Sequence, residues 1–149
     1  MDEYGKKFEK RFALDFSKIP NSFVMRLNDQ MSEFKMTSKN ISDFVCYSYP
    51  YMFCIECKVR KGNTFSLTTF SQLDSMQQTV GKKGLLCGVL IWFIDHDKIC
   101  FCDIDNINNL IAKCKKSINV KMIDDNESGV YSIKSVKKDR KSTRLNSSH

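Results

Sequence analysis

A chain of 149 residues with 42% hydrophobic side chains has the size of one ordinary domain and enough apolar surface for a core. Its formal net charge of +7 suits a polyanionic partner such as DNA. The longest apolar run, residues 85–94, is about strand length, and the charged N-terminus lacks the apolar segment of a signal peptide. These features exclude a membrane-spanning helix and favour a cytoplasmic protein.

The C-terminal tail has an unusual sequence. Residues 139–149 (DRKSTRLNSSH) match a reading frame of a common sequencing-library adapter, and without them the formal charge falls to +5. We interpret the tail as a disordered assembly artefact and expect a single domain over residues 1–138, with its natural C-terminus missing. The alternative is a natural Ser-rich disordered tail.

In chain order, the first expected element is an amphipathic helix over residues 3–16. Apolar side chains recur there at helical spacing, and they are Phe8, Phe12, Ala13 and Phe16. Pro20 ends the helix, because the residue before a proline is biased out of the helical region. Residues 23–27 (FVMRL) predict a short strand, and the polar stretch 28–40 predicts a loop.

A hairpin is expected next. Residues 43–47 and 51–59 are rich in aromatic and β-branched side chains, and Ser48, Tyr49 and Pro50 separate them. The two-residue period of a strand places Cys54, Glu56 and Lys58 on one face of the second strand. A charged pair therefore shares one face of a mostly apolar strand.

The remaining elements alternate between helix and strand. Residues 61–63 predict a turn, and the continuous apolar run 85–93 predicts a strand that is buried on both faces. The other expected elements are a helix over 72–80, a turn over 95–98, a strand over 99–104, a helix over 105–116 and a short irregular remainder. This order predicts an α/β layer fold with one central sheet that is flanked by helices.

Seven cysteines, an odd number, lie mostly within apolar runs. We expect buried thiols in a reducing compartment. The alternative is a zinc half-site at Cys54 and Cys57, which have CxxC spacing, but no second CxxC pair follows.

The hairpin carries residues suited to phosphodiester hydrolysis. Asp43 at the start of one strand and Glu56 in the next could place two carboxylates together, which is the ligand type that Mg²⁺ prefers. Lys58, on the same face as Glu56, adds a cation for the attacking water or for the transition-state charge. Glu-x-Lys on a strand is more often a solvated face, but the apolar neighbours in YMFCIECKV favour a buried and therefore functional pair.

The ordered set of motifs resembles a known family. The segments FEKRF, SDFVCYSYPYMFCIECKVRKGNTFSLTTFSQLDSMQQ and GVLIWF are similar to the RecU-type Holliday junction resolvases of the PD-(D/E)XK nuclease superfamily, and more closely to their phage versions. The likeness covers residues 8–103. It implies a restriction-endonuclease-like core with a mixed sheet, Mg²⁺ as cofactor with Mn²⁺ as a substitute, and a homodimer acting on four-way DNA. It also implies a location in a bacterial cell or a phage-infected host.

The resemblance assigns roles to five residues. Asp43 and Glu56 match the metal-binding acids, and Lys58 matches the lysine that stabilises the transition state. Gln72 matches a glutamine that helps at the metal, the alternative being a polar residue at a helix start. Glu9 matches a helix glutamate that reaches the metal through water, the alternative being an ordinary exposed helix residue.

Two positions depart from the family pattern. Ser42 replaces the proline of the motif, and Ile41 stands where the family has a threonine ligand, so a contact there must come from backbone or from Ser42. Junction selectivity is therefore a weaker expectation than nuclease chemistry. The alternatives are a nuclease of the same superfamily that acts on other branched or duplex DNA, and a non-catalytic DNA-binding protein on the same fold.

Overall fold

The protein is described by a computed structural model, which places residues 3–28 and 40–134. The helical elements are α1 (Glu3–Ser17), α2 (Leu73–Met76), η1 (Gln77–Thr79), η2 (Ile94–His96), α3 (Ile104–Ala112) and α4 (Val120–Asp124). The strands are β1 (Ser22–Arg26), β2 (Phe44–Ser48), β3 (Tyr51–Arg60), β4 (Thr64–Ser66), β5 (Leu85–Phe93), β6 (Lys98–Asp103), β7 (Ser117–Asn119) and β8 (Tyr131–Ile133). The predicted loop over 28–40 and the suspected adapter tail lie almost entirely outside the described residues.

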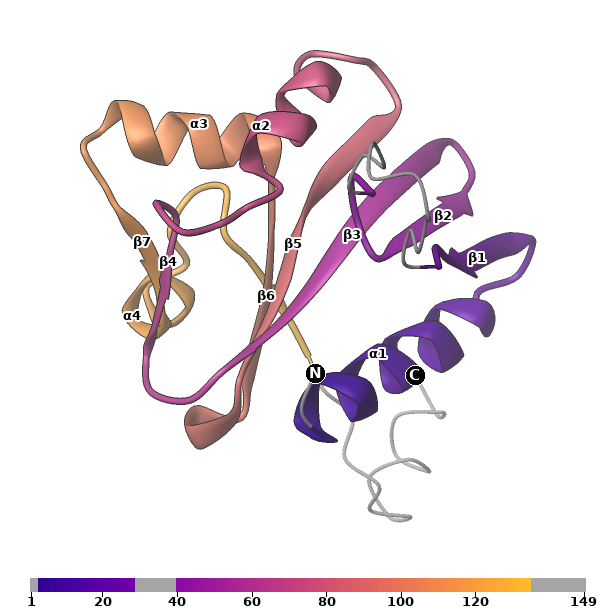
Figure 1. The fold of residues 1–149 in the computed structure, drawn as a ribbon, viewed down its shortest axis with the longest axis horizontal. Helices are drawn as coiled ribbons and strands as arrows, with labels where there is room; N and C mark the ends of the chain where they lie inside the picture. The colour runs from indigo at the N-terminus through magenta and orange to yellow at the C-terminus, as the bar shows by residue number, and fades with distance from the viewer. Residues whose placement is uncertain (1–2, 29–39, 135–149) are drawn as a thin grey trace, which may run out of the picture.

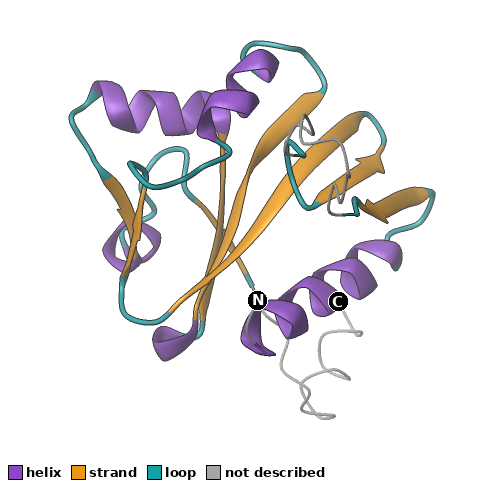
Figure 2. Cartoon of the chain, viewed as in Figure 1, coloured by secondary structure: helices purple, strands orange, loops and turns teal. Residues whose placement is uncertain are grey.

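One mixed sheet organises the molecule. Its strand order is β1-β2-β3-β5-β6-β8, and β4 and β7 form a second, two-stranded sheet. The β3–β5 pair is parallel, whereas the other pairs of the main sheet are antiparallel. Figure 2 shows the small sheet lying apart from the main one. The predicted hairpin and the predicted central strand over 85–93 are both confirmed.

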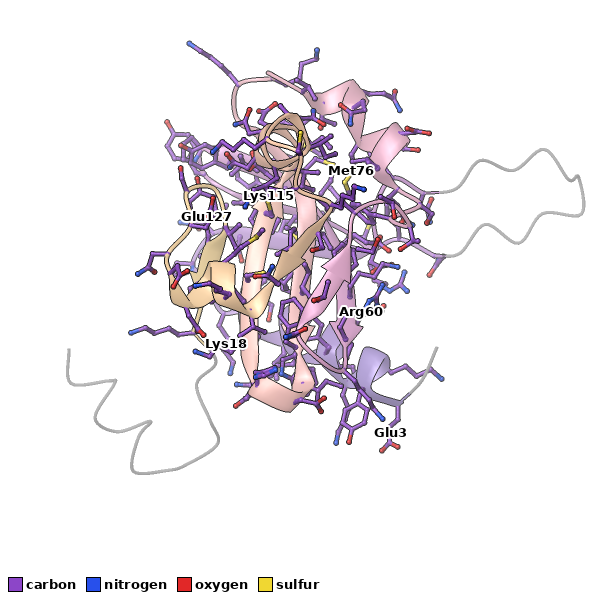
Figure 3. The ribbon with its side chains drawn as sticks, turned by 90° about the vertical axis from the view of Figure 1, so that its left-hand side faces the viewer. Glu3, Lys18, Arg60, Met76, Lys115 and Glu127 are labelled. Carbon is purple, nitrogen blue, oxygen red and sulfur yellow. The ribbon has the colours of Figure 1, made fainter. Side chains whose placement is uncertain are left out.

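The two faces of the sheet are covered differently. Helix α1 crosses one face beside β1, β2 and β3, whereas α2, α3 and the β4–β7 sheet lie on the other side (Figure 1). Aromatic side chains dominate the core under α1, where Phe12 contacts Phe44 and Phe16 contacts Phe53. We call this side the α1 face and the opposite side the α3 face. Figure 3 views the molecule from the side of α3, with Met76 of α2 in the upper half and Arg60 at the end of β3 lower down.

The core of the α3 face is larger. It combines β4, β5, β6 and the helices α2, α3 and α4, and its fully buried side chains include Phe65, Met76, Ile91, Phe93 and Ile107. Strand β5 contributes to both cores, because Val89 and Ile91 point to the α3 face and Leu90 points to the α1 face. None of the described helices is long and apolar enough to cross a membrane.

Three predictions about elements need correction. The helix expected over 72–80 is a four-residue α2 followed by the 3-10 helix η1. The helix expected over 105–116 ends at Ala112, because Cys114 adopts a positive φ of 65° that breaks the helix. The irregular remainder in fact contains β7, α4 and β8, whose three-residue strands are stabilised by pairing with distant segments rather than by a local pattern.

The cysteines behave mostly as predicted. Six of the seven are buried, and Cys114 is exposed. Cys54 belongs to the core of the α3 face, whereas Cys57 belongs to the core of the α1 face. Because the two thiols of the CxxC sequence lie on opposite sides of the sheet, they do not form a zinc half-site.

Candidate active site

The β2–β3 hairpin sets the position of Asp43. Its backbone N–H donates to the carbonyl of Ile55 at 3.1 Å, and its carbonyl accepts from the N–H of Leu27 at 2.8 Å, so Asp43 continues the ladder one residue before β2. Its carboxylate Oδ2 accepts a hydrogen bond from the backbone N–H of Cys57 at 2.9 Å. The side chain of Asp43 is therefore fixed directly beside the strand that carries Glu56.

Strand β3 places Glu56 and Lys58 on the α3 face. Cys54 lies in the core of that face and Ile55 and Cys57 lie in the opposite core, so the two-residue period of the strand directs Glu56 and Lys58 to the side of Cys54. Glu56 is only 4% exposed. Glu56 is therefore not part of a solvated face, and the side chain of Lys58 is 29% exposed.

The carboxylate of Glu56 is incompletely satisfied. Its Oε2 lies 3.5 Å from the Nζ of Lys58, and its Oε1 is buried without a hydrogen-bond partner among the described residues. Burial, followed by the negative charge of Asp43, raises the pKa of Glu56 to about 7, against a smaller opposing effect of Lys58. A buried carboxylate with an unpartnered oxygen is the kind of group that a bound cation would stabilise.

An arginine links Glu9 to Asp43. Arg26, the last residue of β1, donates from its Nε to the Oε1 of Glu9 at 2.7 Å, and its Nη2 lies 3.8 Å from the Oδ1 of Asp43. The same guanidinium donates to the carbonyl of Leu27. Glu9 is 9% exposed, so the alternative that it is an ordinary exposed helix residue is wrong.

The sequence interpretation missed Arg26. The available signal was its position as the one charged residue in the otherwise apolar segment 23–27. A charged side chain in such a strand is normally paired when it is buried, but nothing in the sequence identifies Glu9 and Asp43 as its partners.

The three acids act together on the thiol of Cys57. Its pKa is raised first by burial and then by the charges of Asp43, Glu9 and Glu56. These carboxylates therefore share one region of negative potential. In the described part of the chain, no three His, Cys, Asp or Glu side chains are arranged so that they could hold a metal ion by themselves. Two carboxylates supplemented by water are nevertheless a usual ligand set for Mg²⁺.

The structure does not bring Gln72 into contact with these residues. Gln72 is the N-cap residue of α2, and its side-chain oxygen accepts a hydrogen bond from the hydroxyl of Ser71 at 2.9 Å. Because α2 belongs to the α3 face, Gln72 begins a helix on the same side of the sheet as Glu56. Its role at a metal stays a prediction.

The two departures from the family pattern also have defined places. Ser42 is buried, and its hydroxyl donates to the carbonyl of Phe44 at 2.8 Å. This hydrogen bond stabilises the backbone at the start of β2. Ile41 packs against the core of the α3 face, so its side chain has an apolar role where the family pattern has a threonine.

Comparisons with known proteins identify the fold and the family of the chain. The chain is similar to Hjc, a Holliday junction resolvase from the archaeal hyperthermophile Archaeoglobus fulgidus, with a TM-score of 0.50, 15% sequence identity, and coverage of 95% of this chain and 93% of that chain. The likeness confirms the restriction-endonuclease-like fold. No curated protein sequence matches the chain. The family described as Recombination protein U (RecU) matches residues 6–139. Because this match extends over most of the sequence, the chain belongs to the RecU family of Holliday junction resolvases.

Proposed function

We propose that the protein is a Mg²⁺-dependent endonuclease that resolves four-way DNA junctions by paired nicks, in recombination, repair or phage replication. Membership of the RecU family supports action on DNA. The observation that carries the proposal is the state of Glu56, a buried carboxylate beside Lys58 and near the charge of Asp43, with one oxygen that has no partner in the described part of the chain. A merely structural charge in a sheet would have its polar atoms paired.

The residues at this site fit a divalent cation. Asp43 and Glu56 would hold the ion, Gln72 would complete the site, and Glu9 would reach it through water. When bound, Mg²⁺ supplies polarisation of a phosphoryl oxygen and a lower pKa for water, and Mn²⁺ would substitute for it. The unpartnered Oε1 of Glu56 and its raised pKa are the features that a dication would relieve.

The protein's own side chains then have separate tasks. Lys58, 3.5 Å from Glu56, is placed to orient the attacking water or to neutralise charge on the phosphate. Arg26 contacts Glu9 and lies close to Asp43, so it limits the repulsion between carboxylates that the chemistry requires close together. The buried sheet around Glu56 lowers the local dielectric, which strengthens each of these charge interactions.

Paired nicks require two such sites. Two matching strands of a junction are related by a twofold axis, and a C2 homodimer would present its two active sites with the same symmetry. The proposed working form is therefore a dimer bound to one junction.

The test compares Lys58→Ala with Lys98→Ala. Lys98 is a suitable control because it lies on β6, and its Nζ forms an ion pair with Asp124 at 2.7 Å instead of with Glu56. Each protein is incubated with Mg²⁺ and a four-way junction, a linear duplex of the same sequence, or single-stranded DNA. We expect paired nicks in the junction, roughly 100- to 1,000-fold slower with Lys58→Ala and unchanged with Lys98→Ala.

Each other result has a defined meaning. Cleavage at the wild-type rate by Lys58→Ala would remove the proposed mechanism. Equal cleavage of linear duplex would remove the junction specificity and identify a general duplex nuclease. Junction binding without cleavage by any of the three proteins would identify a non-catalytic DNA-binding protein.

A further inference from the structure

The turn of the β2–β3 hairpin carries an unusually exposed aromatic side chain. Tyr49 is 81% exposed, whereas the other exposed large hydrophobic side chains of the described residues range from 39% to 55%. Single exposed apolar side chains are common on protein surfaces. The surroundings of Tyr49 therefore determine whether its exposure has a function.

The backbone holds this turn firmly at the end of the sheet. The strand register leaves only Tyr49 and Pro50 between the last pair of residues of the hairpin, and the ring of Pro50 restricts its φ. Directly after the turn, the backbone N–H of Met52 donates to the carbonyl of Gly84 at 2.7 Å. A ligand of Tyr49 would therefore meet a backbone that has little conformational freedom to lose.

A basic loop lies against the turn. Residues 81–84 connect η1 to β5, and Lys82 and Lys83 in this loop are exposed. The carbonyl oxygen of Pro50 lies 3.4 Å from the position that a Cβ atom would take on Gly84. Figure 1 shows the turn and the loop at the same end of the sheet. An aromatic ring and two cations thus share one corner of the molecule.

The charges of this loop are available to a ligand. Lys82 and Lys83 take part in none of the ion pairs formed within residues 3–28 and 40–134. The backbone N–H of Gly81 donates to the carboxylate of Asp105 at 3.3 Å, which fixes the start of the loop. Exposed cations on a fixed loop raise the local concentration of a polyanion.

An exposed aromatic ring beside unpaired cations is typical of a surface that binds unpaired nucleotides. Every base has a π face that can stack on such a ring, and basic side chains hold the neighbouring phosphates. Bases inside a continuous duplex already stack on each other, whereas bases at a branch point can leave the stack at a smaller cost. Membership of the RecU family supports DNA as the polyanion.

We infer that Tyr49 stacks on an unpaired base at the branch point of the DNA substrate, while Lys82 and Lys83 contact phosphates of the same strand. This inference rests on the proposed function, because it concerns the DNA that the candidate site would cleave. Tyr49 would recognise the branch, whereas Glu56 and Lys58 would act at the phosphate.

Strand β3 determines the spacing between recognition and cleavage. Tyr51 is the first residue of β3, and its distance to Glu56 along the strand corresponds to about 17 Å. Successive phosphates of one strand of B-DNA are about 3.4 Å apart along the helix axis. The stacked base would therefore lie up to about five nucleotides from the cleaved phosphate.

The first test measures binding in EDTA, without cleavage. A labelled four-way junction and a linear duplex of the same sequence are titrated with each protein, and fluorescence anisotropy gives the dissociation constants. Tyr49→Ala should bind the junction roughly 10-fold more weakly, because it lacks the ring on which a base stacks. It should bind the duplex as the wild type does. Tyr49→Phe keeps the ring and should match the wild type on both DNAs.

Tyr131→Ala is the matched control for this test. Tyr131 is also an exposed aromatic residue, and it lies on β8 at the opposite edge of the sheet. This variant should bind both DNAs as the wild type does, and circular dichroism establishes that each variant is folded. Wild-type junction binding by Tyr49→Ala, or an equal loss in Tyr49→Phe, would overturn the inference.

The second test locates the stacked base. Junctions carry 2-aminopurine, a fluorescent base whose emission falls when it stacks, at successive positions from the branch point. At one position the wild type and Tyr49→Phe should lower the emission roughly twofold or more, because the ring stacks on that base. Tyr49→Leu, which is apolar but has no ring, should leave it unchanged. The comparison remains informative if Tyr49→Ala does not fold.

A third test concerns the two lysines. The double variant Lys82→Met, Lys83→Met should reduce the slope of the logarithm of the binding constant against the logarithm of the salt concentration by about 1.4–1.8, because two phosphate contacts are lost. Lys121→Met is the control, since Lys121 forms an exposed ion pair with Asp125. An unchanged slope in the double variant would contradict the phosphate contacts.

The outcomes separate this inference from the proposed function. If binding depends on Tyr49 as expected and the wild type does not cleave the junction in Mg²⁺, only the proposed function fails. If cleavage depends on Lys58 and no position of the junction shows emission that depends on Tyr49, only this inference fails. A wild type that binds neither the junction nor the duplex would overturn both.

Discussion

Two buried carboxyl groups of this protein, those of Glu56 and Asp103, differ in how their surroundings compensate for the loss of solvent. Glu56 in β3 is 4% exposed and Asp103 at the end of β6 is 6% exposed, and burial raises the pKa of both. The side-chain amide of Asn106 donates a hydrogen bond to Asp103 from the first turn of α3. Glu56 instead has one oxygen without a partner within residues 3–28 and 40–134, and the charges of Asp43 and Glu9 raise its pKa further.

We interpret the difference as that between a structural acid, Asp103, and the proposed metal ligand, Glu56. Asp103 stands at the N-cap position of α3, where a carboxylate is stabilised by the helix terminus and by local donors. Glu56 is placed beside other negative charges that the fold does not neutralise fully. Charge that is left uncompensated at this cost is typical of a site that binds a cation or a substrate.

The largest expected effect is on cleavage. Glu56→Gln should slow Mg²⁺-dependent junction cleavage by about 1,000-fold or more, because a neutral amide is a poor ligand for the ion that stabilises the transition-state charge. Asp103→Asn, the matched change, should cleave at close to the wild-type rate. Single-turnover cleavage of a labelled junction measures both rates, and comparable losses in the two variants would break the distinction.

Glu56→Gln should also make the metal-free protein more stable at high pH. Between pH 4.5 and about 7 the folded protein keeps a proton that the unfolded chain has released, because the pKa of Glu56 is raised to about 7. The free energy of unfolding therefore falls as the pH rises through this window, and the full penalty is present above it.

The variant lacks this penalty. In EDTA at pH 8 the free energy of unfolding of Glu56→Gln should exceed that of the wild type by about 1–3 kcal/mol. This difference should vanish below pH 4.5. Urea denaturation at several pH values measures it. A difference that does not change with pH would show that Glu56 is not the titrating group.

Arg26→Met tests how far the acidic site depends on a neighbouring cation. Its guanidinium contacts Glu9 and approaches Asp43, so its loss should increase the repulsion among the acids and slow cleavage roughly 10- to 100-fold. Arg26→Lys should recover part of the rate. The control is Lys121→Met, because Lys121 forms an exposed pair with Asp125 on the opposite side of the fold. Equal cleavage rates for Arg26→Met and the control would show that Arg26 does not contribute to the cleavage reaction.

The smallest effect is expected at Asp103. Asp103→Ala removes the acceptor of the hydrogen bond from the Asn106 amide, which should lower the free energy of unfolding by about 1 kcal/mol. The cleavage rate per folded molecule should be unchanged. Thermal unfolding measures the stability, and the junction assay measures the cleavage rate of the same variant. A loss of cleavage without a loss of stability would assign Asp103 a part in the reaction.

Local patterns predicted much of the fold. The helical spacing of Phe8, Phe12 and Phe16 and the apolar run of β5 identify their elements because each pattern is long and has one dominant period. The three-residue strands β4, β7 and β8 were missed, since their stability comes from distant partners. The end of α3 was misplaced, because the positive φ of Cys114 has no glycine to mark it.

For the candidate site, the sequence by itself determined which charged residues of β3 share one face. The alternation of YMFCIECKV places Glu56 and Lys58 together in apolar surroundings, which the period of any strand requires. Only the tertiary structure decided which residues of other elements lie near this strand and contact one another. Arg26 reaches Glu9 from 17 residues away along the chain, and the Cys57 N–H fixes Asp43 across the hairpin. Such contacts depend on how helix and strands pack, because periodicity determines the face of a residue but not its neighbour on another element.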